Sequence, residues 1–241
     1  MARHFRGQGW RVAVCDADPA AVESVVGDGS GIIARTADVA DAEAVDAWFD
    51  ALVADCGRLD ALVCNAGIAG PTAPVEDIEP ADWRRTVDVD LNGHFYCVRR
   101  AVPLLKSAGG GSILVTASNA AFFGFPLRAP YTACKWALIG FTKTLAMELG
   151  PHAIRVNAIC PGSVSGPRID GVIERDAAAR GMRAEDIRKI YARQSSMRLF
   201  VDAQEVAGLA YFLASEAGRS ISGQAIGIDG HTEGLSNWLD D

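Results

Sequence analysis

Short apolar runs that alternate with helical segments determine the fold class of this chain. Six such runs are rich in apolar and β-branched residues, and they lie at 11–16, 31–39, 59–67, 112–118, 155–162 and 224–230. Segments with a helical period lie between them, at 41–56, 80–106, 131–149 and 203–214. Strands that alternate with helices form a parallel sheet, because right-handed crossovers place the helices on both of its faces. We therefore expect an α/β chain with a doubly wound parallel sheet, in one domain over residues 1–241.

The composition argues against several functional classes. With 241 residues, of which 49% are hydrophobic and 22% charged, the chain can bury one sizeable core. A net charge of -7 argues against a nucleic-acid surface, which needs clustered positive charge. No run reaches the roughly 18 apolar residues of a membrane span, and no signal-peptide pattern is seen. We expect no nucleic-acid or membrane partner and a cytoplasmic location.

The cysteines and histidines give no sign of a metal site. The six cysteines lack C-x-x-C spacing, and several lie in apolar runs, where a free cysteine behaves as a small hydrophobic residue. The four histidines show no ligand spacing with one another or with cysteine. We expect reduced thiols and no bound metal.

Three residues indicate a reaction type: Ser118, Tyr131 and Lys135. Tyr131 and Lys135 lie four residues apart in a segment of helical period, so their side chains share one helix face. A free phenol is a poor proton carrier at neutral pH, but a neighbouring ammonium favours its phenolate form. Ser118 ends the apolar run 112–118, and open α/β sheets place ligands at the carboxyl ends of their strands. Tyr131 would exchange a proton with a substrate oxygen that Ser118 holds.

In four ordered motifs the chain resembles the short-chain dehydrogenase/reductase family, over about residues 3 to 230. The motifs are Y-x-x-x-K at Tyr131–Lys135, the serine at Ser118, N-A-G at Asn65–Gly67 and P-G at Pro161–Gly162. Within the family, the chain resembles the Ser-Tyr-Lys members, which include 3-oxoacyl-acyl-carrier-protein reductases and sugar and secondary-alcohol dehydrogenases. It implies a Rossmann-like fold and hydride transfer between NAD and a secondary alcohol or carbonyl.

The resemblance also bears on assembly and on the substrate. The family pairs the helices that correspond to 91–106 and 131–149 across two-fold axes, and both carry wide apolar arcs here, so we expect a homotetramer or dimer. The segment 163–200 is charged and weakly apolar, and in the family this region covers the substrate.

The resemblance also implies where a cofactor binds. Asp16 closes the run 11–16, where a carboxylate accepts the ribose hydroxyls of NAD and repels the extra phosphate of NADP, so we expect NAD to be preferred. Asp16 equally suits a turn before a helix that begins near Pro19. The remaining contacts are Asp38 and Val39 at the adenine, Asn65, Ala66 and Gly67 at the adenosine, Tyr131 and Lys135 at the nicotinamide ribose, and Pro161, Gly162 and Val164 at the carboxamide.

Two residues of the site differ from the family pattern. Gly166 stands where the family has a threonine that bonds the carboxamide, so Ser165 or the backbone of Val164 would take that role. Asp90 stands where an asparagine holds a water that relays protons to Lys135. A carboxylate can accept from that water but cannot donate through an amide. Alternatively, Asp90 is an N-cap of the helix that follows it.

The largest departure lies at the start of the chain. The family begins with a strand and a T-G-x-x-x-G-x-G loop that binds the pyrophosphate, whereas residues 1–16 resemble the end of the helix after that loop and the second strand. The first strand is central in the order 3-2-1-4-5-6. Either residue 1 lies downstream of the true start, or the second and fourth strands pair directly. The alternative function is a non-catalytic chain that acts through oligomerisation or interaction.

Overall fold

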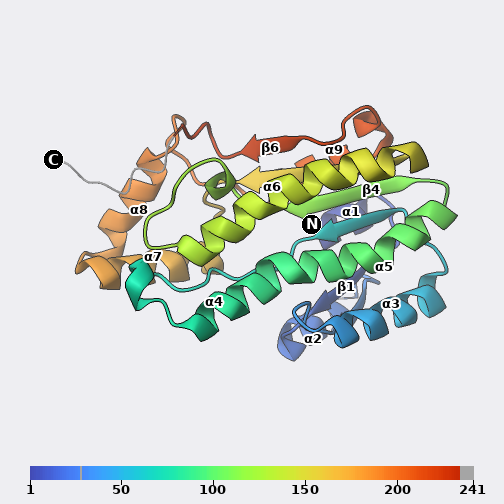
Figure 1. Ribbon diagram of the computed structural model, residues 1–241, viewed down its shortest axis with the longest axis horizontal. Helices are drawn as coiled ribbons and strands as arrows, with labels where there is room; N and C mark the ends of the chain where they lie inside the picture. Colours follow the sequence, from blue (N-terminus) through green and yellow to red (C-terminus); the bar gives the residue numbers. More distant parts are fainter. Residues whose placement is uncertain (28, 234–241) are drawn as a thin grey trace.

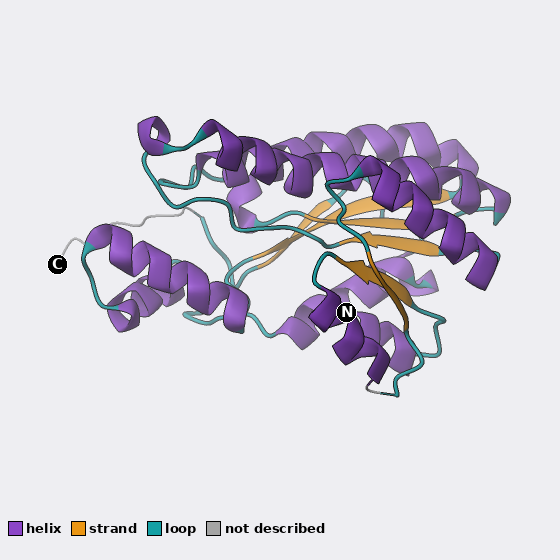
Figure 2. Cartoon of the chain, turned by 90° about the horizontal axis from the view of Figure 1, so that it is seen from below, coloured by secondary structure: helices purple, strands orange, loops and turns teal. Residues whose placement is uncertain are grey.

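The computed structural model describes residues 1–27 and 29–233, so residues 234–241 of the expected domain lie outside the described part. The strands are β1 (Ala13–Asp16), β2 (Ile33–Thr36), β3 (Ala61–Cys64), β4 (Gly111–Thr116), β5 (Ile154–Pro161) and β6 (Ala225–Ile228). The helices are α1 (Ala2–Gly7), α2 (Pro19–Gly27), α3 (Ala42–Cys56), α4 (Pro80–Val87), α5 (Gly93–Ser107), α6 (Ala129–Leu149), α7 (Pro167–Arg180), α8 (Ala184–Arg193) and α9 (Ala203–Ala214). Figure 1 shows this order along the chain, and Figure 2 shows helices on both faces of the strands. The fold is α/β and Rossmann-like, as the alternating pattern predicts.

The strands of the described residues form two parallel sheets rather than one. β1 pairs with β2, and β3, β4, β5 and β6 form a second sheet in that order. β1 and β3 correspond to the second and fourth strands of the family. Within the described part of the chain they share no backbone ladder, so the alternative in which these two strands pair directly is wrong. Their side chains meet instead, because Ala13 and Cys15 of β1 pack against the same hydrophobic cluster as Leu62 and Cys64 of β3. The two sheets therefore share a core without sharing hydrogen bonds.

The strand β4 lies at the centre of the larger sheet and is buried on both faces. Ile113, Leu114 and Val115 are fully buried, which explains why this run is continuously apolar rather than alternating. Successive side chains point to opposite faces, so Ile113 and Val115 pack in the cluster that contains α5 and α6, while Leu114 packs in the cluster that contains α1 and α9. The two helix layers thus hold the carboxyl end of β4 in a fixed place.

The helix α1 is the expected helix end that leads into the first predicted strand. Its Phe5 makes edge-on contacts with Trp10 and Tyr211, at ring-centroid distances of 5.4 and 5.7 Å. Tyr211 belongs to α9, so these contacts join α1 to the last helix.

The predicted helix over 80–106 is present but contains a local irregularity. Between α4 and α5 the chain forms one π-helical turn, Asp88–Asn92. Such turns insert an extra residue into a helix and are frequent at functional sites. Here the turn buries Asp90 completely.

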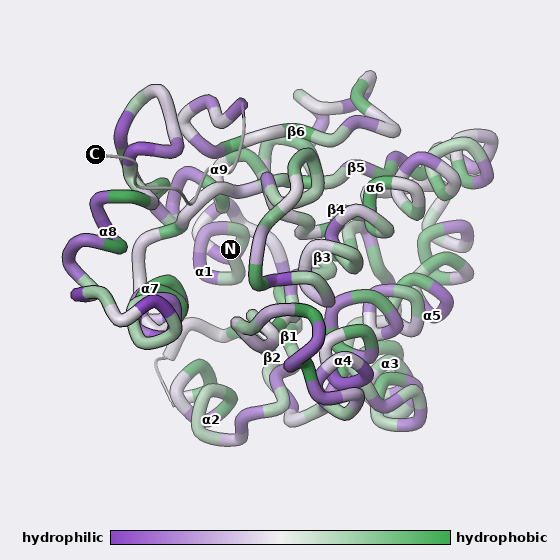
Figure 3. Tube along the Cα trace, turned by 60° about the vertical axis from the view of Figure 1, so that its left-hand side comes forward, coloured by the Kyte–Doolittle hydropathy of each residue, from purple (hydrophilic) through white to green (hydrophobic). Residues whose placement is uncertain are grey.

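The segment 163–200 contains two helices, α7 and α8, which the sequence pattern did not predict. Figure 3 shows polar and apolar stretches mixed along both helices, so the apolar period is hard to see in the sequence. Val172, Ile173, Ile187 and Ile190 form a small hydrophobic cluster of their own. Backbone hydrogen bonds join the two ends of the segment, because Val201 donates to the Ser163 carbonyl at 2.8 Å and accepts from the Ser165 amide at 2.9 Å.

Candidate active site

The helix α6 places Tyr131 and Lys135 on one face, one turn apart. The Lys135 side chain is 3% exposed, and its Nζ lies 5.4 Å from the centroid of the Tyr131 ring. The same Nζ donates to the Thr116 carbonyl at 3.2 Å. Because Thr116 is the last residue of β4, this bond fixes the ammonium at the carboxyl end of the central strand. The predicted meeting of the two side chains is therefore present in the structure.

Ser118 lies just beyond the same strand, as the sequence indicates. Its Oγ accepts from the Ala120 amide at 3.2 Å and so caps a short 3-10 turn, Asn119–Ala121. The hydroxyl also lies 3.4 Å from the Oδ1 of Asn119. With an exposed fraction of 8%, Ser118 is held in place by local hydrogen bonds near the end of β4.

Asp90 forms a buried ion pair with Lys135. Its Oδ2 lies 3.5 Å from the Lys135 Nζ, and its Oδ1 accepts from the Ile68 amide at 2.6 Å. Among the described residues, Oδ2 has no hydrogen-bond partner. The alternative in which Asp90 caps the following helix is wrong, because its carboxylate bonds Ile68 instead of the first turn of α5.

Gly67, the last residue of the N-A-G motif, lies beside the buried ion pair. A Cβ at this position would lie 3.4 Å from the Asp90 Oδ1 and 3.5 Å from the Lys135 Nζ. A larger side chain would crowd the ion pair. Asn65 lies at the same end of the sheet, where its Oδ1 accepts from the Thr116 Oγ1 at 3.4 Å. Ala66 stands between these two residues, directly after β3.

Burial keeps His94, Cys134 and Cys160, which lie near this pair, neutral. Burial, together with the charge of Lys135, lowers the pKa of His94 to about 3. Burial and then the charge of Asp90 raise the pKa of the Cys134 thiol to about 11, although Lys135 opposes this. Burial raises the pKa of the Cys160 thiol to about 12. The Asp90–Lys135 pair therefore lies among groups that are uncharged at neutral pH.

The described residues include no group of three or more His, Cys, Asp or Glu that could hold a metal ion. All six cysteines are free thiols. Within residues 1–27 and 29–233, none of the helices is both long and apolar enough to cross a bilayer.

Asp16 is the last residue of β1, and Asp38 lies two residues after the end of β2. Asp16 is exposed, and its Oδ1 accepts from the Asp18 amide at 2.9 Å, which is the turn that the sequence also allowed. Its Oδ2 has no partner in the described part of the chain, so it is open to a ligand hydroxyl. Both carboxylate oxygens of Asp38 have partners within the chain, because Oδ1 accepts from the Ala40 amide and Oδ2 pairs with the Arg85 Nη2 at 2.9 Å.

Val39 is packed in the core. A Cβ at Gly93 would lie 2.8 Å from the Val39 Cγ2 and 2.9 Å from its carbonyl oxygen, so α5 lies directly on this residue. The Val39 side chain thus packs against α5.

Pro161 ends β5, and Gly162 and Val164 follow it in a tightly held loop. The Gly162 amide donates to the Ile228 carbonyl at 3.1 Å, and a Cβ there would lie 2.8 Å from the Asp229 Cβ. Val164 forms an isolated parallel bridge with Val201.

Gly166 has φ +135° and ψ 178°, a backbone conformation that is essentially restricted to glycine. It occupies the N-cap position of α7, and its carbonyl accepts from the Asp170 amide at 3.2 Å. The threonine of the family could not adopt this conformation without strain. The departure at this position is therefore a change of backbone as well as of side chain.

These residues fit a nicotinamide dinucleotide in part. Asp16, Lys135 and the loop after Pro161 all lie at the carboxyl ends of parallel strands, which is where open α/β sheets bind dinucleotides. The described residues before β1 include α1, which ends at Gly7, and a turn at Gln8 and Gly9, and no strand precedes that turn among them. The described site therefore offers groups for the two riboses and the carboxamide, without a glycine-rich turn for the pyrophosphate.

Two arginines near Tyr131 had no signal in the sequence. The Arg128 side chain lies with its Cζ 5.0 Å from the Tyr131 ring centroid, and Arg168 donates from Nη1 to the Gly67 carbonyl at 2.9 Å. Their positions follow from the loop before α6 and from the placement of α7. Neither follows a strand or belongs to a motif, so their contribution was not predictable.

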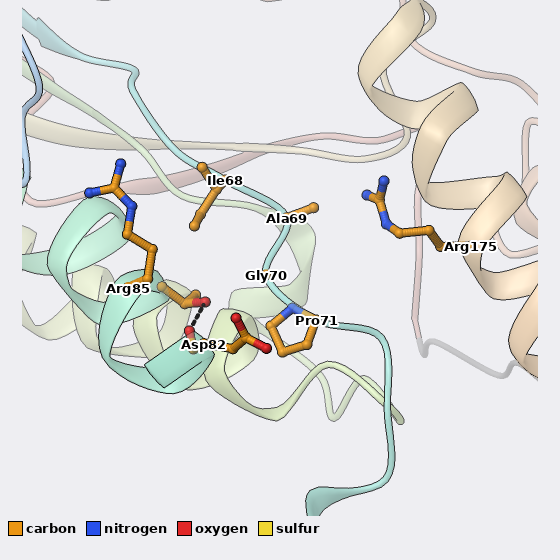
Figure 4. Close-up of a pocket in the computed structure, with 8 residues that line it drawn as sticks. Ile68, Ala69, Gly70, Pro71, Asp82, Arg85 and Arg175 are labelled. Atoms are coloured by element: carbon orange, nitrogen blue, oxygen red, sulfur yellow. Dashed lines mark hydrogen bonds between the residues drawn. The ribbon is translucent and has the colours of Figure 1, made fainter. Parts of the chain in front are cut away.

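A pocket of about 340 Å³ lies beside the segment that follows the N-A-G motif (Figure 4). It is lined by Ile68, Ala69, Gly70, Pro71, Asp82, Arg85, Thr86 and Arg175. Figure 4 shows Arg175 extending from α7 on one side and Arg85 standing on α4 on the other. The pocket thus has basic side chains on two of its walls.

Comparison with known proteins identifies the family. The family model described as Enoyl-(Acyl carrier protein) reductase matches residues 1–232. The chain belongs to the short-chain dehydrogenase/reductase family. A curated relative, trans-4-hydroxycyclohexanecarboxylate dehydrogenase of Sinomonas cyclohexanicum, is 41% identical over 193 residues, which are 80% of this chain and 68% of the relative.

Solved structures of the family superpose closely on this one. Actinorhodin polyketide ketoreductase with NADPH has a TM-score of 0.91 and 28% identity, over 98% of this chain and 92% of that one. NAD+-bound xylitol dehydrogenase has a TM-score of 0.88 and 29% identity, over 94% and 91%. These likenesses support an oxidoreductase that acts on CH–OH donors with a nicotinamide cofactor.

Proposed function

We propose that the chain transfers hydride between NAD and a secondary alcohol or its carbonyl, with Tyr131 as the proton carrier. The observation that carries this is the position of the Lys135 Nζ, which bonds the end of β4, pairs with Asp90 and lies beside the Tyr131 ring. One ammonium thus links the strand end, the buried carboxylate and the phenol. This arrangement suits proton exchange at the carboxyl edge of the sheet.

Each residue has a separate task in this proposal. Tyr131 takes the proton of the alcohol in oxidation and returns it in reduction, while the Ser118 hydroxyl orients the same oxygen. Lys135 places its ammonium beside the Tyr131 ring and would bond the nicotinamide ribose. Asp90 keeps Lys135 in place and can accept from a water that relays protons to it. The bound nicotinamide ring accepts or supplies the hydride.

The preference for NAD over NADP rests on Asp16. Its carboxylate is exposed after β1 and has an oxygen that is open to a ribose hydroxyl. The same negative charge would repel a 2′-phosphate. We therefore expect a higher kcat/KM with NAD than with NADP, and Asp16→Ala should reduce the ratio. Equal kcat/KM values for the two dinucleotides in the wild type would contradict this role of Asp16.

Replacement of Tyr131 tests the catalytic assignment. With a panel of secondary alcohols, Tyr131→Phe should lower kcat by about 100-fold or more, because only the proton carrier is lost. The Kd for NAD should stay within a few-fold of the wild type, whereas Lys135→Ala should damage both. Tyr96→Phe, on α5, is the matched control. Retention of more than about a tenth of the wild-type kcat would mean that another residue carries the proton.

We also propose that the chain assembles as a homotetramer. α5 and α6 lie side by side in Figure 1 and expose large apolar side chains, which are Phe95, Trp136 and Met147, with exposed fractions of 50%, 51% and 83%. Large apolar side chains that are exposed on two such helices suit a protein interface. Light scattering should give a mass close to four times 25.4 kDa, and the mass of one chain would contradict the proposal.

A second candidate function is favoured by the division of the strands into two sheets. Among the described residues, β1 and β3 are not paired and a glycine-rich turn for the pyrophosphate is lacking. A chain of this kind could retain the fold and act through oligomerisation or interaction without catalysis. Titration of the full chain with NAD separates the two, because the enzyme should bind NAD and the interaction protein should not.

A further inference from the structure

Arg128 is a buried cation for which residues 1–27 and 29–233 supply no carboxylate partner. Its side chain is 4% exposed, and its Nη2 donates to the Ala69 carbonyl at 2.6 Å. The other two nitrogens, Nε and Nη1, are closed off from solvent and have no hydrogen-bond partner in the described part of the chain. Proteins normally pair a buried charge, because burial without a partner is unfavourable. The N–H groups at Nε and Nη1 of Arg128 can therefore donate to a group that the described residues do not supply.

The guanidinium lies next to the proposed proton carrier. Its Cζ is 5.0 Å from the centroid of the Tyr131 ring and 5.6 Å from that of Phe125. Contacts with aromatic faces stabilise the cation, but they leave its N–H groups unsatisfied. A molecule whose reacting oxygen meets Tyr131 would thus have its neighbouring atoms within reach of Arg128.

Two further cations, Arg168 and Arg175, act on Arg128, and the lining of the adjoining pocket also includes one carboxylate, that of Asp82. Burial lowers the pKa of Arg128 below its ordinary value, and the charges of Arg175 and Arg168 act in the same direction, although Tyr131 and Tyr191 oppose them. Arg168 donates to the Gly67 carbonyl, and Figure 4 shows Arg175 at the wall of the pocket beside Ala69. A surface of this kind attracts anions.

We propose that the substrate is a short hydroxy acid or oxo acid, whose carboxylate binds Arg128 while its carbinol or carbonyl oxygen meets Tyr131. This substrate class rests on the proposed function of the same site. Nη2 has a second hydrogen, so it can act with Nε or Nη1 as a two-donor edge for a carboxylate. The distance of 5.0 Å between the guanidinium carbon and the Tyr131 ring limits the acid to a few carbons between its two functional groups.

The segment 163–200 covers this position. Ala69 and Phe125 pack against the cluster of α7 and α8, and the Phe125 and Tyr191 ring centroids are 6.4 Å apart. An acid reaches Nε and Nη1 only when side chains of this cluster give way. The carboxylate would then lie between Arg128 and the segment that covers it.

Kinetics with matched substrates test the proposal. The substrates are 3-hydroxybutanoate, 4-hydroxypentanoate and 5-hydroxyhexanoate, each compared with its carboxamide. In the wild type, kcat/KM should be about 10- to 100-fold higher for the best acid than for its carboxamide, as a charge-assisted hydrogen bond provides. Arg128→Met should abolish this preference, so that the acid and its carboxamide have similar kcat/KM values. Arg128→Lys should retain part of it, and the surface variant Arg219→Met should retain all of it.

Two kinetic outcomes would overturn the proposal while the proposed function stands. In the first, wild-type protein uses the acids and the carboxamides equally well. In the second, Arg128→Met lowers kcat/KM for both by the same factor, which would show a structural role for the arginine.

A binding measurement decides the matter if no alcohol is oxidised at all, which would be a failure of the proposed function alone. Pentanoate, which cannot react, is titrated into the full chain by calorimetry. Binding to the wild type and to Arg219→Met, with a loss of at least 10-fold in Arg128→Met and partial recovery in Arg128→Lys, would support the anion site. Absence of binding, or equal binding to the wild type and Arg128→Met, would overturn it.

Discussion

The replacement of Asp90 by asparagine should strongly destabilise the protein. The two charges of the Asp90–Lys135 pair lie 3.5 Å apart with exposed fractions of 0% and 3%, and Coulomb's law gives about 5 kcal/mol for such a pair at an effective dielectric constant of 20. Removal of one partner from a buried pair costs about 3 to 5 kcal/mol, because the other charge stays buried. The carboxamide oxygen of the variant would still accept from the Ile68 amide. The loss of stability would therefore measure the effect of removing the negative charge.

Urea unfolding at pH 7 measures this loss. Asp90→Asn should lower the denaturation midpoint with an unchanged slope, by an amount that corresponds to about 3 to 5 kcal/mol. Asp55→Asn is the control, because Asp55 pairs with Arg35 at 2.9 Å at the surface, where such a pair contributes about 1 kcal/mol or less.

A double-mutant cycle removes the second charge. In Asp90→Asn combined with Lys135→Met no unpaired charge remains, so the loss should be smaller than the sum of the two single losses. If Asp90→Asn costs no more than the surface control, the buried pair does not hold the site together, and our reasoning about Asp90 is wrong.

Three further predictions rest on single residues. Burial lowers the pKa of His94 to about 3 from 6.5. Between these pH values the unfolded chain binds this proton and the folded chain does not, so stability should decrease as the pH is lowered from 6.5 to 3. The free energy of unfolding should change by up to about 1.4 kcal/mol per pH unit. Urea midpoints measured at several pH values should depend less on pH in His94→Gln than in the wild type. Arg155 donates to the Leu213 and Ala214 carbonyls at the end of α9, so Arg155→Met should cost about 2 to 3 kcal/mol in thermal or urea unfolding, and Arg155→Lys less. Gly166→Thr should cost about 1 to 3 kcal/mol by the same measurement, because of the φ of +135°; an unchanged midpoint would contradict the strain.

The sequence predicted the elements that have a regular pattern. The strand β4 is buried on both faces and so reads as a continuous apolar run, and α6 places Tyr131 and Lys135 four residues apart on one face. Both patterns follow from local geometry, and both elements lie where we expected them. α7 and α8 were missed, because their apolar residues pack mainly against each other and against Phe125 within a charged segment.

The sequence by itself determined which residues are candidates for the proposed chemistry, because the identities and spacing of Ser118, Tyr131 and Lys135 do not depend on the rest of the fold. Only the tertiary structure decided what surrounds them. The π-helical turn buries Asp90 against Lys135, whereas the sequence equally allowed Asp90 to be the N-cap of the helix that follows it. The loop before α6 brings Arg128 beside Tyr131, and β1 meets β3 through side chains without pairing. These contacts join residues that lie far apart in the chain or in irregular loops, so no local period or motif records them.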